Sequence, residues 1–412
     1  MRFWAGSFAG MELTAGQGGV SGYTGFMNTV RLGIIGMGNI GRHHAEYLLA
    51  GKVEHGELTA VCSTSPARLG DYRVKGLKVF GDGLELIRSG AVDAVIVATP
   101  HYQHTPLGIA TLEQGLHLMV EKPISAHKAD AERLIAAHRQ HPQPLFAVMF
   151  QMRAEPRYQQ LRKLIPSTAF GELVRVNWIN TDWYRTEAYY TSSAWRATWQ
   201  GEGGGVLINQ CLHNLDMLQW LCGMPARVRG FCQFGRFHNI EVEDNLTAYL
   251  EWPNDATGAF ISSTGEAPGT NRLELVGTRG TLILEPGKLT FARNAADMVQ
   301  FSRTAKQGFV KPESRTEEIP FADAQAPHAA VMQNFVNAIL DREPLIAPGE
   351  EGIHSLELAN AIVHSSVLGQ TLDLPMDGAA WEQELTRLIK ASKTEKQIRQ
   401  TATDDFANSF RK

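Results

Sequence analysis

Two groups of residues have the types and spacing needed for acid–base chemistry, and the first is Glu121-Lys122-Pro123. It directly follows a short apolar run that is typical of a buried strand. A lysine held at a strand end could stabilise a substrate alkoxide and pass on a proton, since burial or neighbouring positive charge lowers its pKa. A surface lysine is the ordinary alternative, but the place at the strand end favours a functional role.

The second group follows the triple glycine Gly203-Gly204-Gly205. If a helix begins after these glycines, Asn209, His213 and Asp216 share one of its faces at spacing i, i+4 and i+7. Histidine is a natural acceptor for a hydroxyl proton near neutral pH. A core or capping histidine is the alternative interpretation. Zinc is a further one, but no third ligand is evident, so we predict no metal.

A glycine-rich turn between Val30 and Ala45 predicts a dinucleotide site. The apolar run Val30–Ile35 leads directly into G-x-G-x-x-G, and a helical pattern follows. The first glycine permits the turn, the second lets the backbone approach a pyrophosphate, and the third allows close helix packing. An ordinary glycine-rich loop lacks these flanking elements. The residues expected to contact the cofactor here are Gly36, Gly38, Asn39, Ile40 and Gly41.

The segment after the second expected strand bears on the choice between NAD and NADP. An acidic side chain usually bonds the ribose 2′-hydroxyl there. Ser63 occupies that place instead, followed by Thr64 and Arg68. Two hydroxyls and a guanidinium could bind a 2′-phosphate, with no carboxylate to repel it. The pattern favours NADP over NAD, although another segment could still supply an acid.

Strand and helix patterns alternate between residues 29 and 150, which predicts an α/β fold with a doubly wound parallel Rossmann sheet. Ligands of such sheets bind beyond the carboxyl ends of the strands. The expected strands are Val30–Ile35, Leu58–Cys62, Ala94–Ala98, Leu116–Val120 and Leu145–Met149, with helices that include Thr105–Gln114 and Ala126–Arg139.

Between residues 151 and 376 the pattern changes to short strands separated by turn residues, which predicts a second, α+β domain with a mostly antiparallel sheet. The expected strands are Leu173–Ile179, Arg227–Phe234, Asn245–Glu251, Gly258–Ser263, Arg272–Val276 and Thr281–Leu284. Three helices, at about Gly205–Leu221, Pro327–Leu340 and Gly352–Leu368, are expected to cover one face of this sheet.

Both ends of the chain differ from its middle. Residues 1–28 are rich in glycine and aromatics without hydrophobic periodicity, so we expect a flexible extension, with Met27 a candidate natural start. Residues 377–412 are expected to form a helical or disordered tail.

Composition excludes several classes of partner. The 412 residues are 43% hydrophobic and 20% charged, as in globular proteins, and the net charge of −4 gives no basic surface for nucleic acid. No run approaches the roughly 18 apolar residues of a membrane span. The four cysteines form no C-x-x-C pair, and three lie in apolar runs, which favours free thiols in the cytoplasm.

Aromatic residues next to charged ones suggest a place for substrate. Tyr184 lies in the polar stretch Asp182–Arg185, which precedes Trp195-Arg196. Aromatic faces beside arginine suit sugar rings, although packing between domains or subunits is an equal alternative. Arg153 and His101 are further candidates for the rim of a substrate pocket.

Taken together, the motifs resemble a known family. G-x-G-x-x-G at 36–41, T-P-x-x-x-H at 99–104, E-K-P at 121–123 and G-G-G…H-x-x-D at 203–216 occur in this order. As a set they resemble the Gfo/Idh/MocA oxidoreductases, the family of glucose–fructose oxidoreductase and inositol dehydrogenase. The resemblance extends from about Val30 to about Leu374.

The resemblance implies that a hydride moves between a sugar, polyol or related carbohydrate and NAD or NADP. It also implies a large open sheet in the second domain that builds homodimers or homotetramers. Lys122 matches the lysine of E-K-P, and His213 matches the proton-relay histidine. The residues then expected at the cofactor are Thr99, Pro100, His104, Glu121, Lys122, Trp195 and Arg196, and those expected at the substrate are Lys122, Arg153, Tyr184, Asn209 and His213.

One position departs from the family pattern. Many members have aspartate four residues before the relay histidine, whereas this chain has Asn209. An amide can orient a hydroxyl but cannot relay a proton, so acid–base work moves to His213 and Lys122. Alternatives to a dehydrogenase are a redox-assisted glycoside hydrolase that keeps its cofactor bound, and a non-catalytic cofactor-binding protein.

Overall fold

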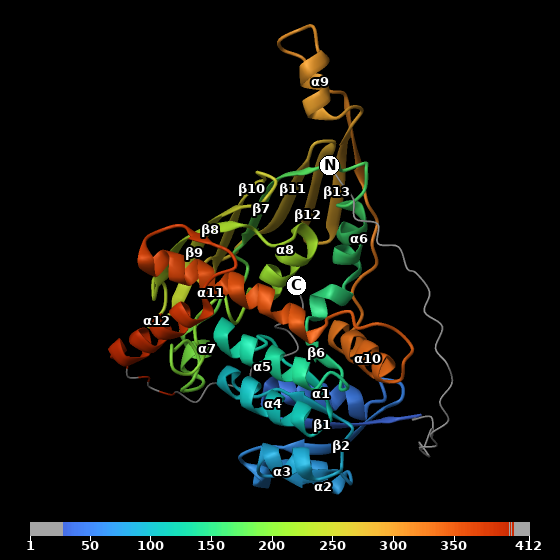
Figure 1. The fold of residues 1–412 in the computed structure, drawn as a ribbon, viewed down its shortest axis with the longest axis vertical. Coiled ribbons are helices and arrows are strands. Elements are labelled where there is room, and N and C mark those ends of the chain that lie inside the picture. Colours follow the sequence, from blue (N-terminus) through green and yellow to red (C-terminus); the bar gives the residue numbers. More distant parts are fainter. Residues whose placement is uncertain (1–27, 395, 397, 399–412) are drawn as a thin grey trace, which may run out of the picture.

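The computed structural model describes residues 28–394, 396 and 398. The predicted flexible extension, except for Asn28, therefore lies outside the described residues, as do residues 395, 397 and 399–412 of the predicted tail, whereas the first part of that tail forms helix α12 (Gly378–Ala391). What is described forms two sheets with helices packed on them (Figure 1), so the predicted α/β class is confirmed. Within this part of the chain, no helix has both the length and the apolarity needed to cross a membrane.

The first sheet is the predicted parallel Rossmann sheet. Its six strands follow the order β3-β2-β1-β4-β5-β6, with every neighbouring pair parallel. The order reverses between β1 and β4, and this switch point is where such sheets bind ligands. The strands are β1 (Val30–Ile35), β2 (Gly56–Cys62), β3 (Lys78–Phe80), β4 (Ala94–Val97), β5 (His117–Val120) and β6 (Phe146–Val148).

Helices connect these strands, as parallel pairing requires. Each predicted strand is present, whereas β3 was not predicted because it has only three residues, none of them fully buried. The helices are α1 (Asn39–Leu49), α2 (Gly70–Val74), α3 (Gly83–Arg88), α4 (His104–Glu113) and α5 (Lys128–Gln140), with 3₁₀ turns at Pro66–Leu69 and His101–Gln103.

The second sheet has nine strands in the order β14-β13-β12-β11-β7-β10-β9-β8-β15. All neighbouring pairs are antiparallel except β7 with β10. The strands are β7 (Leu173–Asn180), β8 (Arg227–Phe234), β9 (Glu243–Glu251), β10 (Thr257–Ser263), β11 (Asn271–Gly277), β12 (Gly280–Glu285), β13 (Lys288–Asn294), β14 (Ser314–Glu318) and β15 (Leu372–Asp373).

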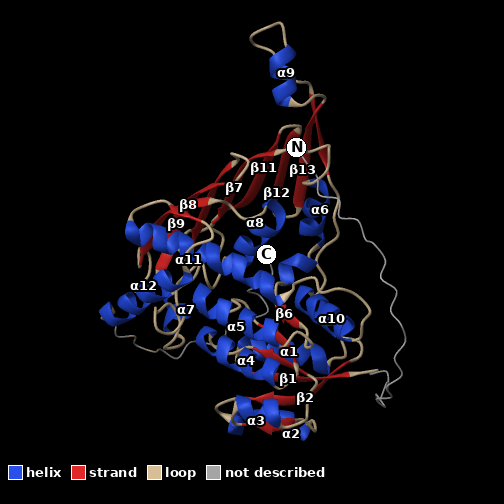
Figure 2. Ribbon diagram, viewed as in Figure 1, coloured by secondary structure: helices blue, strands red, loops and turns tan. Residues whose placement is uncertain are grey.

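Helices cover one face of this sheet, and Figure 2 shows α8 and α11 in front of its strands. Buried side chains of both helices share one core with the alternating inward residues of the sheet. The helices of this part are α6 (Pro156–Leu164), α7 (Glu187–Thr191), α8 (Leu212–Cys222), α11 (Gly352–Leu368) and α12 (Gly378–Ala391), with 3₁₀ turns at Gln151–Ala154 and Gly349–Glu351.

Helix α10 (Pro327–Ile339) corrects one expectation. We expected it on the large sheet, but Val331, Met332 and Phe335 are buried in one cluster with Leu32 of β1 and Met149. The chain therefore returns to the Rossmann sheet after completing most of the second one. Sequence periodicity identifies an apolar helix face but not which of two apolar surfaces it covers.

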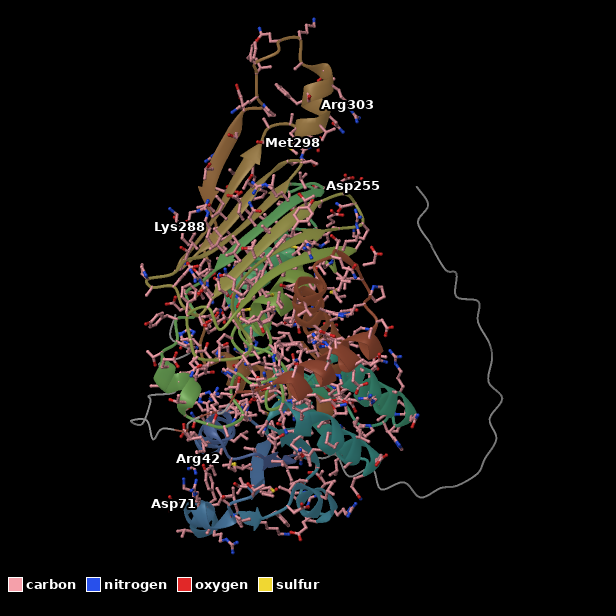
Figure 3. All side chains as sticks on the ribbon, turned by 90° about the vertical axis from the view of Figure 1, so that its left-hand side faces the viewer. Arg42, Asp71, Asp255, Lys288, Met298 and Arg303 are labelled. Atoms are coloured by element: carbon pink, nitrogen blue, oxygen red, sulfur yellow. The ribbon has the colours of Figure 1, made fainter. Side chains whose placement is uncertain are left out.

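A short arm projects beyond the large sheet. It joins β13 to β14 and contains helix α9 (Met298–Thr304), none of whose residues is buried. Figure 3 shows Met298 and Arg303 on this arm, far from the Rossmann end of the molecule where Arg42 and Asp71 lie.

Candidate active site

The turn after β1 has no room for a side chain at two of its three glycines. A Cβ atom on Gly36, whose φ is +101°, would lie 2.5 Å from the Ala98 carbonyl oxygen. On Gly41 it would lie 1.9 Å from the Gly36 oxygen, whereas on Gly38 it would meet nothing within 4 Å. Gly38 caps helix α1 without a side-chain hydrogen bond. The space beside Gly38 at the N-terminus of α1 fits the approach of a pyrophosphate.

Residues after β2 line the same edge of the sheet. Ser63 is half-buried, and Thr64 and Arg68 are exposed. The acid of the neighbouring β3 loop, Asp82, accepts hydrogen bonds from the backbone N–H groups of Leu84 (2.8 Å) and Glu85 (3.1 Å). Asp82 thus caps helix α3.

The loops after β4 and β5 are tied together by His104. Its buried ring nitrogens lie 2.7 Å from the Pro123 carbonyl oxygen and 2.8 Å from that of Thr99. Both ring nitrogens therefore face backbone oxygens of the protein, and the predicted cofactor contact of His104 stays a prediction. The imidazole fixes the relative position of Thr99-Pro100 and the E-K-P turn.

Glu121 anchors the lysine turn in the core. Its carboxylate lies 2.6 Å from His44 Nε2, and His44 Nδ1 lies 2.6 Å from the Tyr47 hydroxyl. Burial raises the pKa of Glu121, but the hydrogen bond and charge of His44 outweigh it and lower this pKa overall. We did not single out His44 and Tyr47 in the sequence, since their link to Glu121 spans more than 70 residues.

Lys122 reaches from the first sheet to the glycine turn of the second part. Its half-buried Nζ donates a 2.7 Å hydrogen bond to the backbone oxygen of Asn209. Burial lowers the pKa of Lys122, while the carboxylates of Glu121 and Glu202 partly counteract this effect. A lysine in this state keeps further N–H groups for a ligand and releases its proton more readily than a surface lysine.

His213 is buried next to this lysine. Burial, followed by the positive charge of Lys122, holds the pKa of His213 well below its ordinary value of 6.5, so the ring is neutral at physiological pH. Its Nδ1 is buried without a hydrogen-bond partner in the described part of the chain. A neutral imidazole with an unused nitrogen is suited to accept a proton.

The segment before His213 is not the helix that we predicted from Gly205. Helix α8 begins only at Leu212, and Asn209 lies in a series of turns. The buried carboxylate of Glu243 holds these turns by accepting hydrogen bonds from the N–H groups of Gly205 (2.9 Å) and Leu207 (3.1 Å). Burial raises the pKa of Glu243 to about 7. Local spacing alone does not reveal an acid 38 residues away.

Glu202 is a further residue that the sequence did not reveal. Its buried carboxylate accepts a hydrogen bond from the side-chain amide of Asn209 and one of 2.5 Å from the backbone N–H of Ala197. Its backbone oxygen accepts a 2.9 Å hydrogen bond from His101 Nδ1. A single acid before a triple glycine does not indicate in the sequence that it contacts Asn209, Ala197 and His101.

Aromatic rings and arginines surround this cluster. Arg196 donates a 2.6 Å hydrogen bond to the hydroxyl of Tyr189 and lies over the rings of both Tyr189 and Trp195. Arg185 also lies over Tyr189. The expected substrate residue Tyr184 is 50% exposed beside them.

Arg153 corrects another expectation, because its side chain is fully buried. Its guanidinium donates hydrogen bonds of 2.7 and 2.9 Å to the buried carboxylate of Asp216, and it also pairs with Glu351. It therefore joins the 3₁₀ turn Gln151–Ala154, helix α8 and the turn before α11. Asp216, which we expected on the same face as His213, points into this ion pair.

We predict that Arg153→Ala destabilises the protein, because it leaves the Asp216 carboxylate buried and unpaired. The free energy of unfolding in urea should fall by about 3–5 kcal/mol. The exposed Arg303→Ala on α9 is the control and should change it by about 0.5 kcal/mol at most. An unchanged unfolding free energy for Arg153→Ala would contradict a structural role.

Comparisons with known proteins agree with this geometry. Residues 30–149 match the model of the "Oxidoreductase family, NAD-binding Rossmann fold", and residues 158–283 match that of the "GFO/IDH/MocA C-terminal domain". Inositol 2-dehydrogenase of Rubrobacter xylanophilus is 26% identical over 347 residues, which cover 82% of this chain and 90% of that protein.

Solved structures show the same fold. The WlbA dehydrogenase from Bordetella pertussis, in complex with NADH and UDP-GlcNAcA, has a TM-score of 0.70 at 26% identity and covers 85% of this chain and 100% of that one. Levoglucosan dehydrogenase with NADH and L-sorbose has a TM-score of 0.70 at 19% identity, covering 84% and 99%. With its two sheets, its glycine turn and both family matches, this chain belongs to the Gfo/Idh/MocA family of NAD-binding oxidoreductases.

Proposed function

We propose that this protein oxidises a hydroxyl-bearing carbon of a sugar, polyol or related carbohydrate, and that Lys122 and His213 form its acid–base pair. The observation that carries the proposal is how charge is arranged around Lys122 and His213. A lysine and a neutral histidine with an unused nitrogen lie close enough for the lysine charge to lower the histidine pKa. These two groups meet the needs of alcohol oxidation, which are a cation for the developing alkoxide and a base for its proton.

The residues of the chain have separate tasks in this mechanism. The glycine turn, Thr99, Pro100, Glu121, Trp195 and Arg196 would hold the dinucleotide, which would supply the hydride acceptor when bound. His213 takes the hydroxyl proton. Lys122 keeps its proton and stabilises the negative charge that develops on the substrate oxygen. Asn209 orients a neighbouring hydroxyl through its amide.

The carbohydrate class rests on family and surroundings together. Members similar to this chain are named inositol 2-dehydrogenase, and a fold neighbour is named levoglucosan dehydrogenase. Tyr184, Tyr189 and the two nearby arginines offer aromatic faces and donors, which suit the C–H patches and hydroxyls of a sugar ring. Arg153 is not part of this proposal, since it is buried in an ion pair.

The direct test is Lys122→Ala, assayed with polyols and sugars by absorbance of reduced nicotinamide. We expect kcat to fall by about 10²- to 10⁴-fold, because the alkoxide loses its cation, while cofactor binding measured by fluorescence persists. In the wild type, oxidation should be lost on the acid side only below pH 6.5, as His213 takes up a proton at its lowered pKa.

The matched control is the exposed Lys288→Ala at the start of β13, which should leave turnover unchanged (Figure 3). Turnover that survives in Lys122→Ala would refute the assignment of the pair. Cleavage of a glycoside without net reduction of cofactor would instead establish the redox-assisted hydrolase.

We further propose that the cofactor is NADP in preference to NAD. Support comes from the Ser63, Thr64 and Arg68 side chains at the end of β2, and from the use of Asp82 as a helix cap. Arg68→Ala should raise KM for NADP by roughly 10- to 100-fold through loss of a charged hydrogen bond, and leave KM for NAD unchanged. The exposed Arg88→Ala on α3 is the control. Equal effects on both cofactors would contradict the preference.

We also propose a homodimer or homotetramer built through the open face of the large sheet. Register places Phe231, Thr247, Ile261 and Ile179 side by side across four strands, and Phe231 is 56% exposed. Phe231→Asp should reduce the mass measured by light scattering to that of one chain, whereas Phe309→Asp on the arm should not. A wild-type mass of one chain would contradict the proposal.

The four free cysteines support a reducing compartment, the cytoplasm.

A further inference from the structure

The side-chain amide of Asn209 has a fixed orientation. An ionised carboxylate only accepts hydrogen bonds, so the Asn209 nitrogen Nδ2 must face Glu202 and the oxygen Oδ1 must point away from it. Both oxygens of Glu202 accept from N–H donors, of Asn209 and of Ala197, which is the pattern of the ionised form. Asn209 therefore presents its acceptor oxygen Oδ1 on the side away from Glu202, beside the second N–H of Nδ2.

Glu202 also supplies negative charge beside Lys122. The other nearby acid is Glu121, which lies 2.6 Å from His44 and raises the pKa of Lys122 more than Glu202 does. Glu202 contacts the side chain of the same Asn209 whose backbone oxygen binds Lys122 Nζ, and its charge raises the pKa of that lysine. Arg185 and Arg196 are the further groups whose charge changes the pKa of Lys122. The charge of Lys122 in turn changes the pKa of His101, His104, Cys211, His213 and His328.

Burial of Glu202 has a cost that its partners offset only in part, because the pKa of its carboxyl group stays raised. Burial raises the pKa of this carboxyl group, and the charge of Arg196, the two N–H donors and Lys122 act in the opposite direction. Glu202 is a buried acid that is held by several donors beside the hydrogen bond from Lys122 to Asn209. Its partners link it to chemistry at the site.

We propose that Glu202 is a positioning residue of the reaction, acting with Asn209 as a divided carboxylate. Glu202 adds its negative charge to that of Glu121, which favours the protonated form of Lys122, and it turns Asn209 so that Oδ1 accepts a hydrogen bond from a substrate hydroxyl. The pair performs both tasks that a single aspartate at position 209 would perform. This inference rests on the proposed function for its substrate step, but the effect on Lys122 is independent of turnover.

Two single variants separate the tasks. Glu202→Gln keeps the shape and removes the charge, so kcat should fall by about 10- to 100-fold and Lys122 should titrate at lower pH. Asn209→Ala removes the amide but keeps both the Glu202 charge and the backbone oxygen at 209. It should therefore lower kcat without shifting the titration of Lys122.

The titration is measured without substrate, as the pH dependence of Lys122 acetylation by acetic anhydride, quantified by peptide mass spectrometry. The double variant Glu202→Gln/Asn209→Asp moves the charge to position 209. It should restore the Lys122 titration and recover most of the lost kcat. Asn209→Asp alone places two carboxylates in contact and should be impaired.

An unchanged Lys122 titration in folded Glu202→Gln would overturn the proposal, as would a double variant no better than Glu202→Gln. If Glu202→Gln does not fold, as judged by thermal unfolding, a Lys122 titration that shifts in Asn209→Ala would also overturn it. A wild type without dehydrogenase activity refutes the proposed function alone, since the acetylation result does not depend on it.

Discussion

The hydrogen bond from Lys122 Nζ to the backbone oxygen of Asn209 joins the two halves of the site. At 2.7 Å, it links the end of β5 in the parallel sheet to the glycine turn that precedes α8. For this contact to form, the E-K-P turn must be held by His104 and Glu121 from one side, and the glycine turn by Glu243 from the other. Each of these supports is a buried polar group that is satisfied by a specific partner.

The protonation states of the site residues follow from this arrangement. Lys122, His213, Glu121 and Glu202 are close enough to influence one another in surroundings that exclude much of the water. Burial alone would favour the neutral form of all four groups. Pairing with His44 favours the charged form of Glu121, whereas each influence on His213 from the described residues lowers its pKa, so the site combines a cation with a neutral imidazole. Such divergence of pKa values among neighbouring groups is how acid and base roles are divided.

Much of the fold followed from the sequence because its signals are local. The strand–glycine–helix order at Gly36–Gly41 and the alternation of strands and helices were sufficient for the Rossmann sheet. The errors arose where distant residues decide the local structure. Hydrogen bonds to Glu243 hold a series of turns where we predicted the start of a helix. Helix α10 covers the parallel sheet, although its periodicity does not indicate which of the two sheets it packs on.

The site was predicted less completely for the same reason. Lys122 and His213 belong to motifs, so their approach to one another could be expected. His44 contacts Glu121, which lies far along the chain, and Glu202 contacts Asn209 without a regular spacing. No local pattern therefore indicates either contact. Arg153 looked like a pocket residue because it follows a sheet strand, but its partners Asp216 and Glu351 lie in later helical segments.

The most direct test of the account follows the hydride itself. Carbohydrates deuterated at their hydroxyl-bearing carbons would be incubated with the wild-type protein and NADP or NAD, and the reduced cofactor and the sugar product analysed by mass spectrometry. The account predicts one deuterium in the reduced nicotinamide for each keto or lactone product formed. Product formation without deuterium in the cofactor pool, or no oxidation of any carbohydrate tested, would contradict it.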